Sequence, residues 1–220
     1  PGATVGLTAA GGNGFGNGQT QLEEPGKIDI DSQGNLYIAD TGNNRVQKWE
    51  YGGLTGTTVA GGNGFGKGLN QLHNPFGIAV DKFGAVYISE LSNHRVTKWN
   101  PGALEGEIVA GGNGEGNSAN QLAIPMGVAV NKSGDLYIAD TYNHRIQLWK
   151  KGSTEGITLI SARDFKNGYE TNYFSGISIV NESYLYITDY HEKRIIQYHI
   201  DSDTFEVILT NDSLKNDKDK

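Results

Sequence analysis

The sequence predicts an all-β protein made of consecutive four-stranded units, and two features carry this prediction. The first is an internal repeat of about 50 residues. It aligns AGGNGFGNGQTQLEEP, AGGNGFGKGLNQLHNP and AGGNGEGNSANQLAIP, which begin at Ala10, Ala60 and Ala110. The second is that the 32 glycines cluster at fixed places in the repeat, while the apolar runs between them have the length of strands.

The same register continues through the rest of each unit. The segments NLYIADTGNNRVQKW, AVYISELSNHRVTKW and DLYIADTYNHRIQLW are followed by a fourth, divergent copy, YLYITDYHEKRIIQY. They end at Trp49, Trp99, Trp149 and Tyr198. Four copies of one pattern therefore indicate four structural units.

Each unit contains four runs of strand-forming residues separated by Gly, Asn, Asp and Pro turns. In the second unit we expect these strands at Ile78–Val80, Val86–Ser89, Val96–Trp99 and Thr57–Ala60. The first tight turn has a glycine in three units, where a positive φ angle is most easily supplied by Gly. These glycines are Gly34, Gly84 and Gly134.

A single four-stranded sheet cannot bury both of its faces, so neighbouring sheets must stack, and radial stacking gives a β-propeller. The central part of each unit, GIAVD followed by G.LYIAD..NHR.Q.W, resembles the NHL repeat. The resemblance covers four units. It implies an NHL-type propeller, usually of six blades, in which the first strand of each unit lines a central channel and the fourth lies outside.

We expect NHL blades at residues 11–60, 61–110 and 111–160, a divergent blade at 161–210 and a polar tail at 211–220. PGATVGLTAAGG at Pro1 matches PGALEGEIVAGG at Pro101, so residues 1–10 are expected to form the outer strand of a preceding blade, at Thr4–Ala10. Four blades and one extra strand indicate part of a six-bladed ring or of a larger assembly. That strand is expected to pair with a segment outside these 220 residues.

Composition narrows the possible partners. The net charge of −7 and the pI near 5.2 oppose attraction to nucleic acid. No apolar run approaches the roughly 18 residues of a membrane span. The chain has no Cys and opens without an initiator Met, which we interpret as a processed or truncated start.

Every unit has an acidic residue and an arginine five residues apart across the turn between its second and third strands. A bidentate ion pair across this turn is expected. Because it recurs in every unit, whereas catalysis needs one asymmetric constellation, we interpret these pairs as structural staples. They are Asp40 with Arg45, Glu90 with Arg95, Asp140 with Arg145 and Asp189 with Arg194.

The Gly-rich loops lack the Gly-Lys-Ser/Thr ending of a phosphate-binding loop, so we interpret them as compact surface loops that form one rim. Loops on a rigid scaffold are common binding sites. The candidate binding residues are Asn13, Phe15, Asn63, Phe65, Phe76, Asn113, Tyr142, His94 and His144. His94 and His144 come from different blades and are too far apart to share one ion, so neither a metal nor another cofactor is predicted.

Other repeated or unusual residues have structural interpretations. The repeated aromatics are expected to pack between blades: Trp49, Trp99, Trp149 and Tyr198, with Tyr37, Tyr87, Tyr137 and Tyr186. Lys27 and Asp29 in the first inner strand are expected to form a local ion pair rather than a polar channel lining. Asn131, Asn181 and Asn211 open N-glycosylation triplets.

These features predict a noncatalytic recognition scaffold, extracellular or secreted, that binds a protein or a glycan through the loop rim. One alternative is a structural subunit of an extracellular assembly or fibre, in which copies join through open blade edges. The other is an NHL-type lyase or lactonase with a central metal, which the resemblance admits although no catalytic set can be matched onto this chain.

Overall fold

The computed structural model describes residues 6–165 and 172–209. Within these residues the chain forms four antiparallel sheets of four strands each, and the strands of every sheet follow one another in chain order. The protein is therefore all-β, and its sheets match the blades of a β-propeller. We number these sheets as blades 1 to 4.

The strands have the following bounds. Blade 1 consists of β1 (Pro25–Ile30), β2 (Leu36–Asp40), β3 (Arg45–Trp49) and β4 (Gly56–Gly61), and blade 2 of β5 (Pro75–Val80), β6 (Val86–Glu90), β7 (Arg95–Trp99) and β8 (Glu107–Gly111). Blade 3 consists of β9 (Pro125–Val130), β10 (Leu136–Asp140), β11 (Arg145–Trp149) and β12 (Ile157–Ser161), and blade 4 of β13 (Phe174–Val180), β14 (Tyr184–Asp189), β15 (Arg194–His199) and β16 (Thr204–Leu209). Short 3₁₀ turns occur at Thr41–Asn43 (η1), Thr141–Asn143 (η2) and Ala162–Asp164 (η3).

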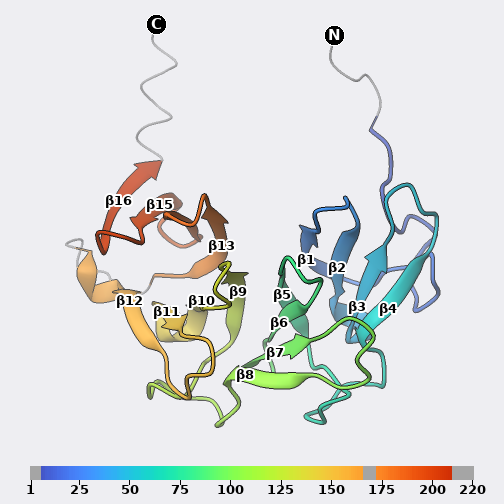
Figure 1. Ribbon diagram of the computed structural model, residues 1–220, viewed down its shortest axis with the longest axis horizontal. Helices are drawn as coiled ribbons and strands as arrows, with labels where there is room; N and C mark the ends of the chain where they lie inside the picture. The colour runs from blue at the N-terminus through green and yellow to red at the C-terminus, as the bar shows by residue number, and fades with distance from the viewer. Residues whose placement is uncertain (1–5, 166–171, 210–220) are drawn as a thin grey trace, which may run out of the picture.

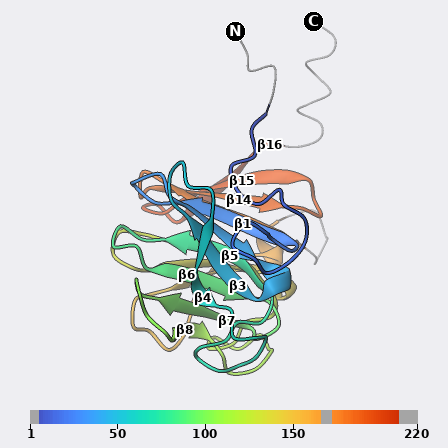
Figure 2. The ribbon, with the colours of Figure 1, turned by 90° about the vertical axis from the view of Figure 1, so that its right-hand side faces the viewer.

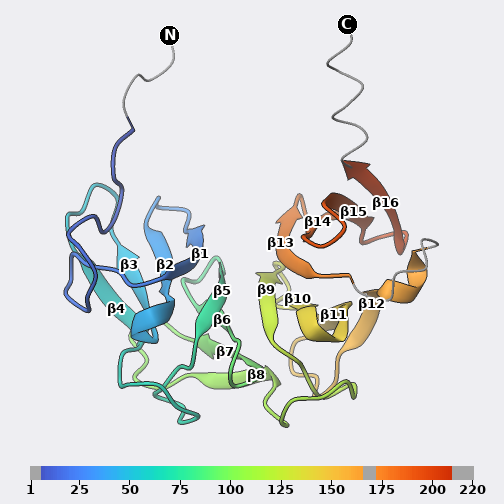
Figure 3. The same cartoon turned by 180° about the vertical axis from the view of Figure 1, so that it is seen from behind.

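The blades stand side by side in an open arc (Figure 1). The strands β1, β5, β9 and β13 lie on the inside of the arc, and each contacts the next. Blades 1 and 4 are the two ends of the arc (Figure 3). Turned by 90°, the blades are seen stacked behind one another (Figure 2).

The core lies between consecutive blades, because side chains alternate between the two faces of each strand. One face of blade 1, with Tyr37 and Val46, packs against Ile78, Ile88 and Trp99 of blade 2. The same contact recurs between blades 2 and 3 and between blades 3 and 4. Each interface therefore buries one face of two sheets, at roughly 1.5–3 kcal/mol for each large apolar side chain.

Six of the eight repeated aromatics lie buried in the clusters between blades, as the inter-blade interpretation requires: Tyr37, Tyr87, Tyr137, Trp99, Trp149 and Tyr198. Trp49 is also buried, but it lies in none of these clusters. Tyr186 is only half-buried. It belongs to blade 4, which has no further blade beside it among the described residues. The glycines of the first turn have the predicted positive φ angles, +83° at Gly34, +80° at Gly84 and +89° at Gly134.

The outer strands of blades 1 to 3 end one residue beyond the predicted unit boundaries. Residues 6–10 form no strand, and residues 1–5 lie outside the described residues, so the outer strand expected at Thr4–Ala10 stays a prediction. The predicted tail at 211–220 also lies outside them.

Candidate functional site

The Gly-rich loops and the turns between second and third strands meet on one side of the molecule, which we call the loop rim. It comprises the loops 11–24, 61–74 and 111–124 and the turns 41–44, 91–94 and 141–144. The amide of Asn93, in a turn, donates to the carbonyl of Gly66, in a loop, at 2.8 Å, and blades 1 and 3 have the same bond. Loop and turn are therefore held together in each of the first three blades.

The arginine of each turn makes the strongest of these connections. Arg95 Nε donates to Glu90 Oε1 at 2.8 Å, and both side chains are buried. The other two guanidinium nitrogens donate to the carbonyls of Lys67, Gly68 and Gln71 at 2.8, 3.2 and 3.2 Å. The ion pair predicted across the turn is thus present, but its arginine also binds three carbonyls of the Gly-rich loop.

The other blades repeat this arrangement with small changes. Arg45 pairs with Asp40 at 2.7 Å and Arg145 with Asp140 at 2.6 Å, and each also donates to three loop carbonyls. In blade 4, Arg194 lies 3.1 Å from Asp189 and stacks over the ring of Phe165. These contacts fit the role of staple, which mutation tests below.

The acidic member of each pair also binds the end of the loop. Asp140 Oδ1 accepts the backbone N–H of Ala123 at 2.7 Å, while Oδ2 accepts from Asn143 and Arg145. Burial raises the pKa of the Asp140 carboxyl, and these hydrogen bonds oppose that shift because they favour the charged form. A buried charge is unfavourable unless it is paired and hydrogen-bonded, so the charged Asp140 carboxylate needs all three of these donors.

Each loop is also braced from within. Gln71 Nε2 donates to the carbonyl of Asn63 at 3.1 Å, and the Asn63 amide donates to the carbonyl of Asn70 at 2.9 Å. Asn113 makes the same bond in the third loop, and in the first loop Gln21 donates to the carbonyl of Asn13. The side chains of the binding candidates Asn63 and Asn113 are therefore engaged in holding their own loops.

The apolar candidates on the rim face solvent instead. Phe15 is 86% exposed, Phe65 69% and Tyr142 51%. Phe65 packs on His73 with ring centroids 5.2 Å apart. Phe76 is half-buried in β5 beside Gly26 of β1, so it lies on the inside of the arc and apart from the other candidates.

Tyr142 begins a row of tyrosines that sequence reasoning missed. Its ring centroid lies 6.0 Å from that of Tyr173, which lies 6.4 Å from that of Tyr190. Tyr190 takes the place of Thr41 and Thr141 in the repeat, and it is exposed. That departure from the repeat was the signal that could have found it.

His94 and His144 do not converge. His94 Nδ1 accepts the backbone N–H of Ile124 at 3.2 Å, whereas His144 Nδ1 donates to the carbonyl of Asn172 at 2.6 Å. Each imidazole holds the segment that leads into the next blade. Across residues 6–165 and 172–209, no group of three or more His, Cys, Asp or Glu side chains is placed to hold a metal ion.

The local ion pair expected between Lys27 and Asp29 is wrong, since these two described side chains form no salt bridge. Asp29 instead accepts the backbone N–H groups of Val80 and Ile30, at 2.7 and 2.8 Å, and burial raises its pKa. Lys27 reaches across the inside of the arc, where its Nζ would lie 3.4 Å from a Cβ built on Gly176. Lys27 and Asp29 therefore have different neighbours, although both belong to β1.

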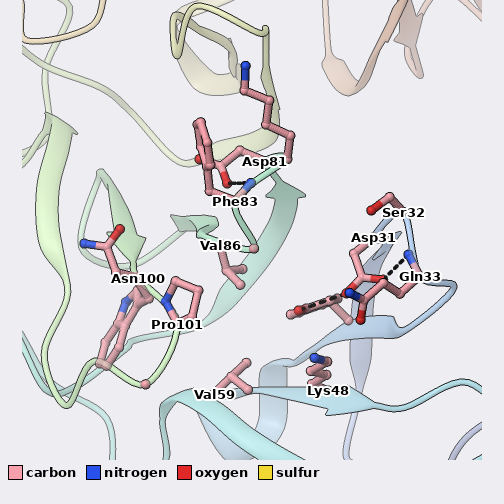
Figure 4. Close-up of a pocket in the computed structure, with 15 residues that line it drawn as sticks. Asp31, Ser32, Gln33, Lys48, Val59, Asp81, Phe83, Val86, Asn100 and Pro101 are labelled. Carbon is pink, nitrogen blue, oxygen red and sulfur yellow. Dashed lines mark hydrogen bonds between the residues drawn. The ribbon is translucent and has the colours of Figure 1, made fainter.

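Two grooves open on the side opposite the rim, and sequence reasoning missed them as well. A cavity of about 360 Å³ lies between blades 1 and 2, and one of about 390 Å³ lies at the equivalent place between blades 2 and 3. Figure 4 shows Lys48, Val86 and Pro101 around the first. Its carboxylates Asp31 and Asp81 accept backbone N–H groups of their own turns, so they are already satisfied.

The glycosylation candidates differ in accessibility. Asn131 is half-buried and its amide lies 3.3 Å from the Asp135 carboxylate, whereas Asn181 is exposed. Asn211 lies outside the described residues. No helix among the residues described is long and apolar enough to cross a bilayer.

Comparison with known proteins identifies the repeat. The family model of the NHL repeat matches residues 22–49 and 122–148, which cover strands of blades 1 and 3. The search of curated proteins found no match.

Several solved structures share the fold. A chain of the nidogen/laminin complex is 18% identical with a TM-score of 0.64, over 86% of this chain and 64% of that chain. Virginiamycin B lyase from Staphylococcus aureus is 15% identical with a TM-score of 0.56, over 83% and 54%. A gluconolactonase from Xanthomonas campestris is 13% identical with a TM-score of 0.61, over 82% and 60%. The chain thus spans between about half and two thirds of the length of these structures.

Proposed function

We propose that this chain, which carries NHL repeats on β-propeller blades, is a noncatalytic recognition scaffold that binds a protein through the loop rim. The observation that carries the proposal is the exposure of Phe15 and Phe65 at the same position of two braced loops. Aromatic side chains supply much of the binding energy in protein interfaces. Two of them at equivalent places form a repeated contact surface.

The bracing of the loops supports this role. Arg45 and Arg95 hold the carbonyls of the two loops, and Gln21 and Gln71 tie each loop to itself. A loop fixed before binding loses less conformational entropy when the partner arrives. The rim therefore presents its aromatic rings at a lower entropic cost than a loose loop would.

A protein fits this rim better than a small molecule does. The phenylalanines project from loops, whereas small ligands favour concave sites. The nidogen/laminin, lyase and lactonase structures are 18%, 15% and 13% identical to this chain, and all three support the fold alone. We also propose that the protein is extracellular and that its blades belong to a larger ring.

The test compares three proteins in a crosslinking pull-down from an extracellular-matrix extract. They are the wild type, a rim variant with Phe15→Ser and Phe65→Ser, and a control with Phe83→Ser, a phenylalanine equally exposed on the opposite side. We expect the wild type and the control to retain the same protein and the rim variant to lose it. Retention by the rim variant and loss by the control would move the site to the grooves. Binding of the wild type to a glycan array alone would replace the protein by a glycan.

A further inference from the structure

Lysine side chains gather on the side of the molecule opposite the loop rim. Most lysines of the described residues line the cavities between blades 1 and 2 and between blades 2 and 3: Lys48, Lys82, Lys98, Lys132, Lys150 and Lys151. Only Lys27, Lys67 and Lys193 lie elsewhere in that part of the chain. Because the whole chain has a net charge of −7, this gathering of cations is a property of one surface and not of the composition.

The densest group of lysines is found at a small cavity between blades 2 and 3. The cavity has a volume of about 170 Å³ and is lined by Lys82, Lys98, Lys132 and Lys151. It adjoins the cavity of about 390 Å³ between the same blades, since Tyr87, Lys98, Gly134 and Lys151 line both. The small cavity has room for a compact anionic group, and the larger one has the size of a ligand pocket, roughly 300–1,000 Å³.

Three of these lysines have no carboxylate partner among the described residues. Lys98 lies 3.4 Å from Glu107, and Lys150 lies 3.4 Å from Asp135. Lys82, Lys132 and Lys151 form no such pair within the same residues, and all three are exposed. Their ammonium groups are therefore free to bind an anion from outside the chain.

The carboxylates that line the small cavity are bound by backbone groups. Asp81 Oδ1 accepts the N–H groups of Phe83 and Ala85 at 2.8 and 3.0 Å. Glu182 Oε2 accepts the backbone N–H of Lys132 at 3.0 Å. These carboxylates hold the turns that carry the lysines, and none of them lies in a salt bridge with a lysine ammonium of the small cavity.

The lysines of the small cavity depart from the repeat. Lys82 and Lys132 share a repeat position at which blade 1 has Ser32, and at the position of Lys151 blade 1 has Tyr51. The staple arginines, in contrast, recur in all four blades. A residue that a blade needs for its own fold recurs, so lysines that differ from blade to blade and meet at one cavity indicate a binding role.

Lys151 is held in place by the turn beside it. Asp135 Oδ1 accepts the backbone N–H of Lys151 at 2.9 Å. The Lys151 Cδ would lie 3.1 Å from a Cβ built on Gly134, so the stem of the lysine packs on this glycine. A side chain whose stem is already fixed loses less entropy when its ammonium binds a ligand.

We propose that the two adjoining cavities bind an oligosaccharide that carries sulfate groups. One sulfate occupies the small cavity beside Lys132 and Lys151, and the sugar chain continues through the larger cavity, where Ser153 and Thr154 offer hydroxyl groups to those of the sugar. A short chain responds mainly to these nearby charges, because charges more than about 8–10 Å away are screened at physiological salt. A nucleic acid duplex would instead extend over the acidic remainder of the surface.

The repeat itself supplies substitutions that a blade tolerates. A groove variant with Lys132→Ser and Lys151→Tyr has at both positions the residues of blade 1. A matched control with Lys67→Asn and Lys193→Asn removes the same charge from exposed lysines elsewhere, and it too introduces residues that blade 1 has at those positions. Unchanged urea midpoints of both variants show that they fold.

The probe is a fluorescent octasaccharide prepared from heparin, titrated with each protein at several salt concentrations. We expect the groove variant to bind it about tenfold more weakly than the wild type, with a shallower dependence on salt because two ammonium contacts are lost. The control should bind like the wild type. The rim variant with Phe15→Ser and Phe65→Ser should also bind like the wild type, so this result is independent of the proposed function of the rim.

Three results would overturn the proposal. The first is a wild type that does not bind the octasaccharide at about 1 mM protein. The second is an equal loss of affinity in the groove variant and the control, which would attribute binding to net charge. The third is an RNA octanucleotide or an acidic octapeptide that binds more tightly than the octasaccharide and loses affinity in the groove variant, which would assign the cavities to that class of ligand.

Discussion

At the scale of single residues, the turn arginines connect the most parts of the molecule. The buried guanidinium of Arg95 connects β6, β7 and the loop 61–74, and the Glu90 carboxylate balances its positive charge. The planar guanidinium can serve a carboxylate and several carbonyls at once, which a lysine ammonium cannot do with the same geometry. The position therefore demands arginine rather than positive charge alone.

We expect Arg95→Ala to lower the free energy of unfolding by about 3 kcal/mol, because Glu90 would remain buried and charged without its partner. Arg95→Lys should recover only part of this loss, since one ammonium cannot replace the donors to the three loop carbonyls. Urea denaturation measures both, with Lys82→Ala, an exposed lysine, as the control. A fully stable Arg95→Ala protein that lost only its partner would make this arginine part of the binding site.

The raised pKa of Tyr87 predicts that the stability of the folded protein falls at alkaline pH. Burial, followed by the nearby charge of Asp81, raises its pKa to about 12, against about 10 for an unfolded tyrosine. Below pH 10 both states are protonated and the full stability is present. Between about pH 10 and 12 the unfolded state ionises first, so stability falls.

Tyr87→Phe should therefore flatten the loss of stability above pH 10 and change little at pH 7, since the bond to Asp81 is long at 3.4 Å. Urea midpoints measured from pH 7 to 11 check this. Equal slopes for the two proteins would show that Tyr87 does not control this loss.

At the scale of elements, the Gly-rich loop is a folded part of each blade rather than a loose connection. Gly61 has φ +67°, and a Cβ there would lie 2.5 Å from the carbonyl oxygen of Asn44 and 2.9 Å from Leu72. Gly64 in the same loop has φ +76°, and nothing lies within 4 Å of its Cβ position. The two glycines differ in their surroundings but share a left-handed backbone.

We expect Gly61→Ala to destabilise the protein by about 3 kcal/mol, because it adds a clash with backbone to the strain of a positive φ. Gly64→Ala carries the backbone strain alone and should cost about 1 kcal/mol. Thermal and urea unfolding of the two variants measure the difference. Equal costs would show that the loop can shift away from β3 without loss.

At the scale of the whole molecule, stability resides in the contacts between blades. Leu72 and Leu122 are fully buried in such contacts, whereas Leu22 is only half-buried. The three leucines have the same place in the repeat, but among the described residues only Leu72 and Leu122 have a preceding blade beside them. Their substitution therefore measures what one neighbouring blade contributes.

Leu72→Ala and Leu122→Ala should each cost about 3 kcal/mol, since each would leave a cavity between two sheets. Leu22→Ala should cost less than about 1 kcal/mol, because the Leu22 side chain is still partly in solvent. Unfolding at low protein concentration gives these values. A loss at Leu22 as large as at Leu122 would mean that other parts of the chain already cover Leu22.

The repeat in the sequence predicted the strands, their order and the buried aromatics, because strand alternation and turn glycines are local properties. It also located the acid and arginine pairs, which are fixed by a spacing of five residues across one turn. Nothing local indicated that Arg95 would bind the carbonyls of Lys67 and Gly68. Those contacts join segments 27 and 28 residues apart.

The sequence by itself thus determined the blade, since the hydrophobic period and the turns of one unit suffice to define it. Only the tertiary structure decided which repeat leucines are fully buried, which asparagine side chains bind within their own loops and which neighbours Lys27 contacts. The same residue type at the same repeat position, Leu22 or Leu122, differs in burial. Burial depends on what lies beside a blade, and no spacing within the blade encodes that.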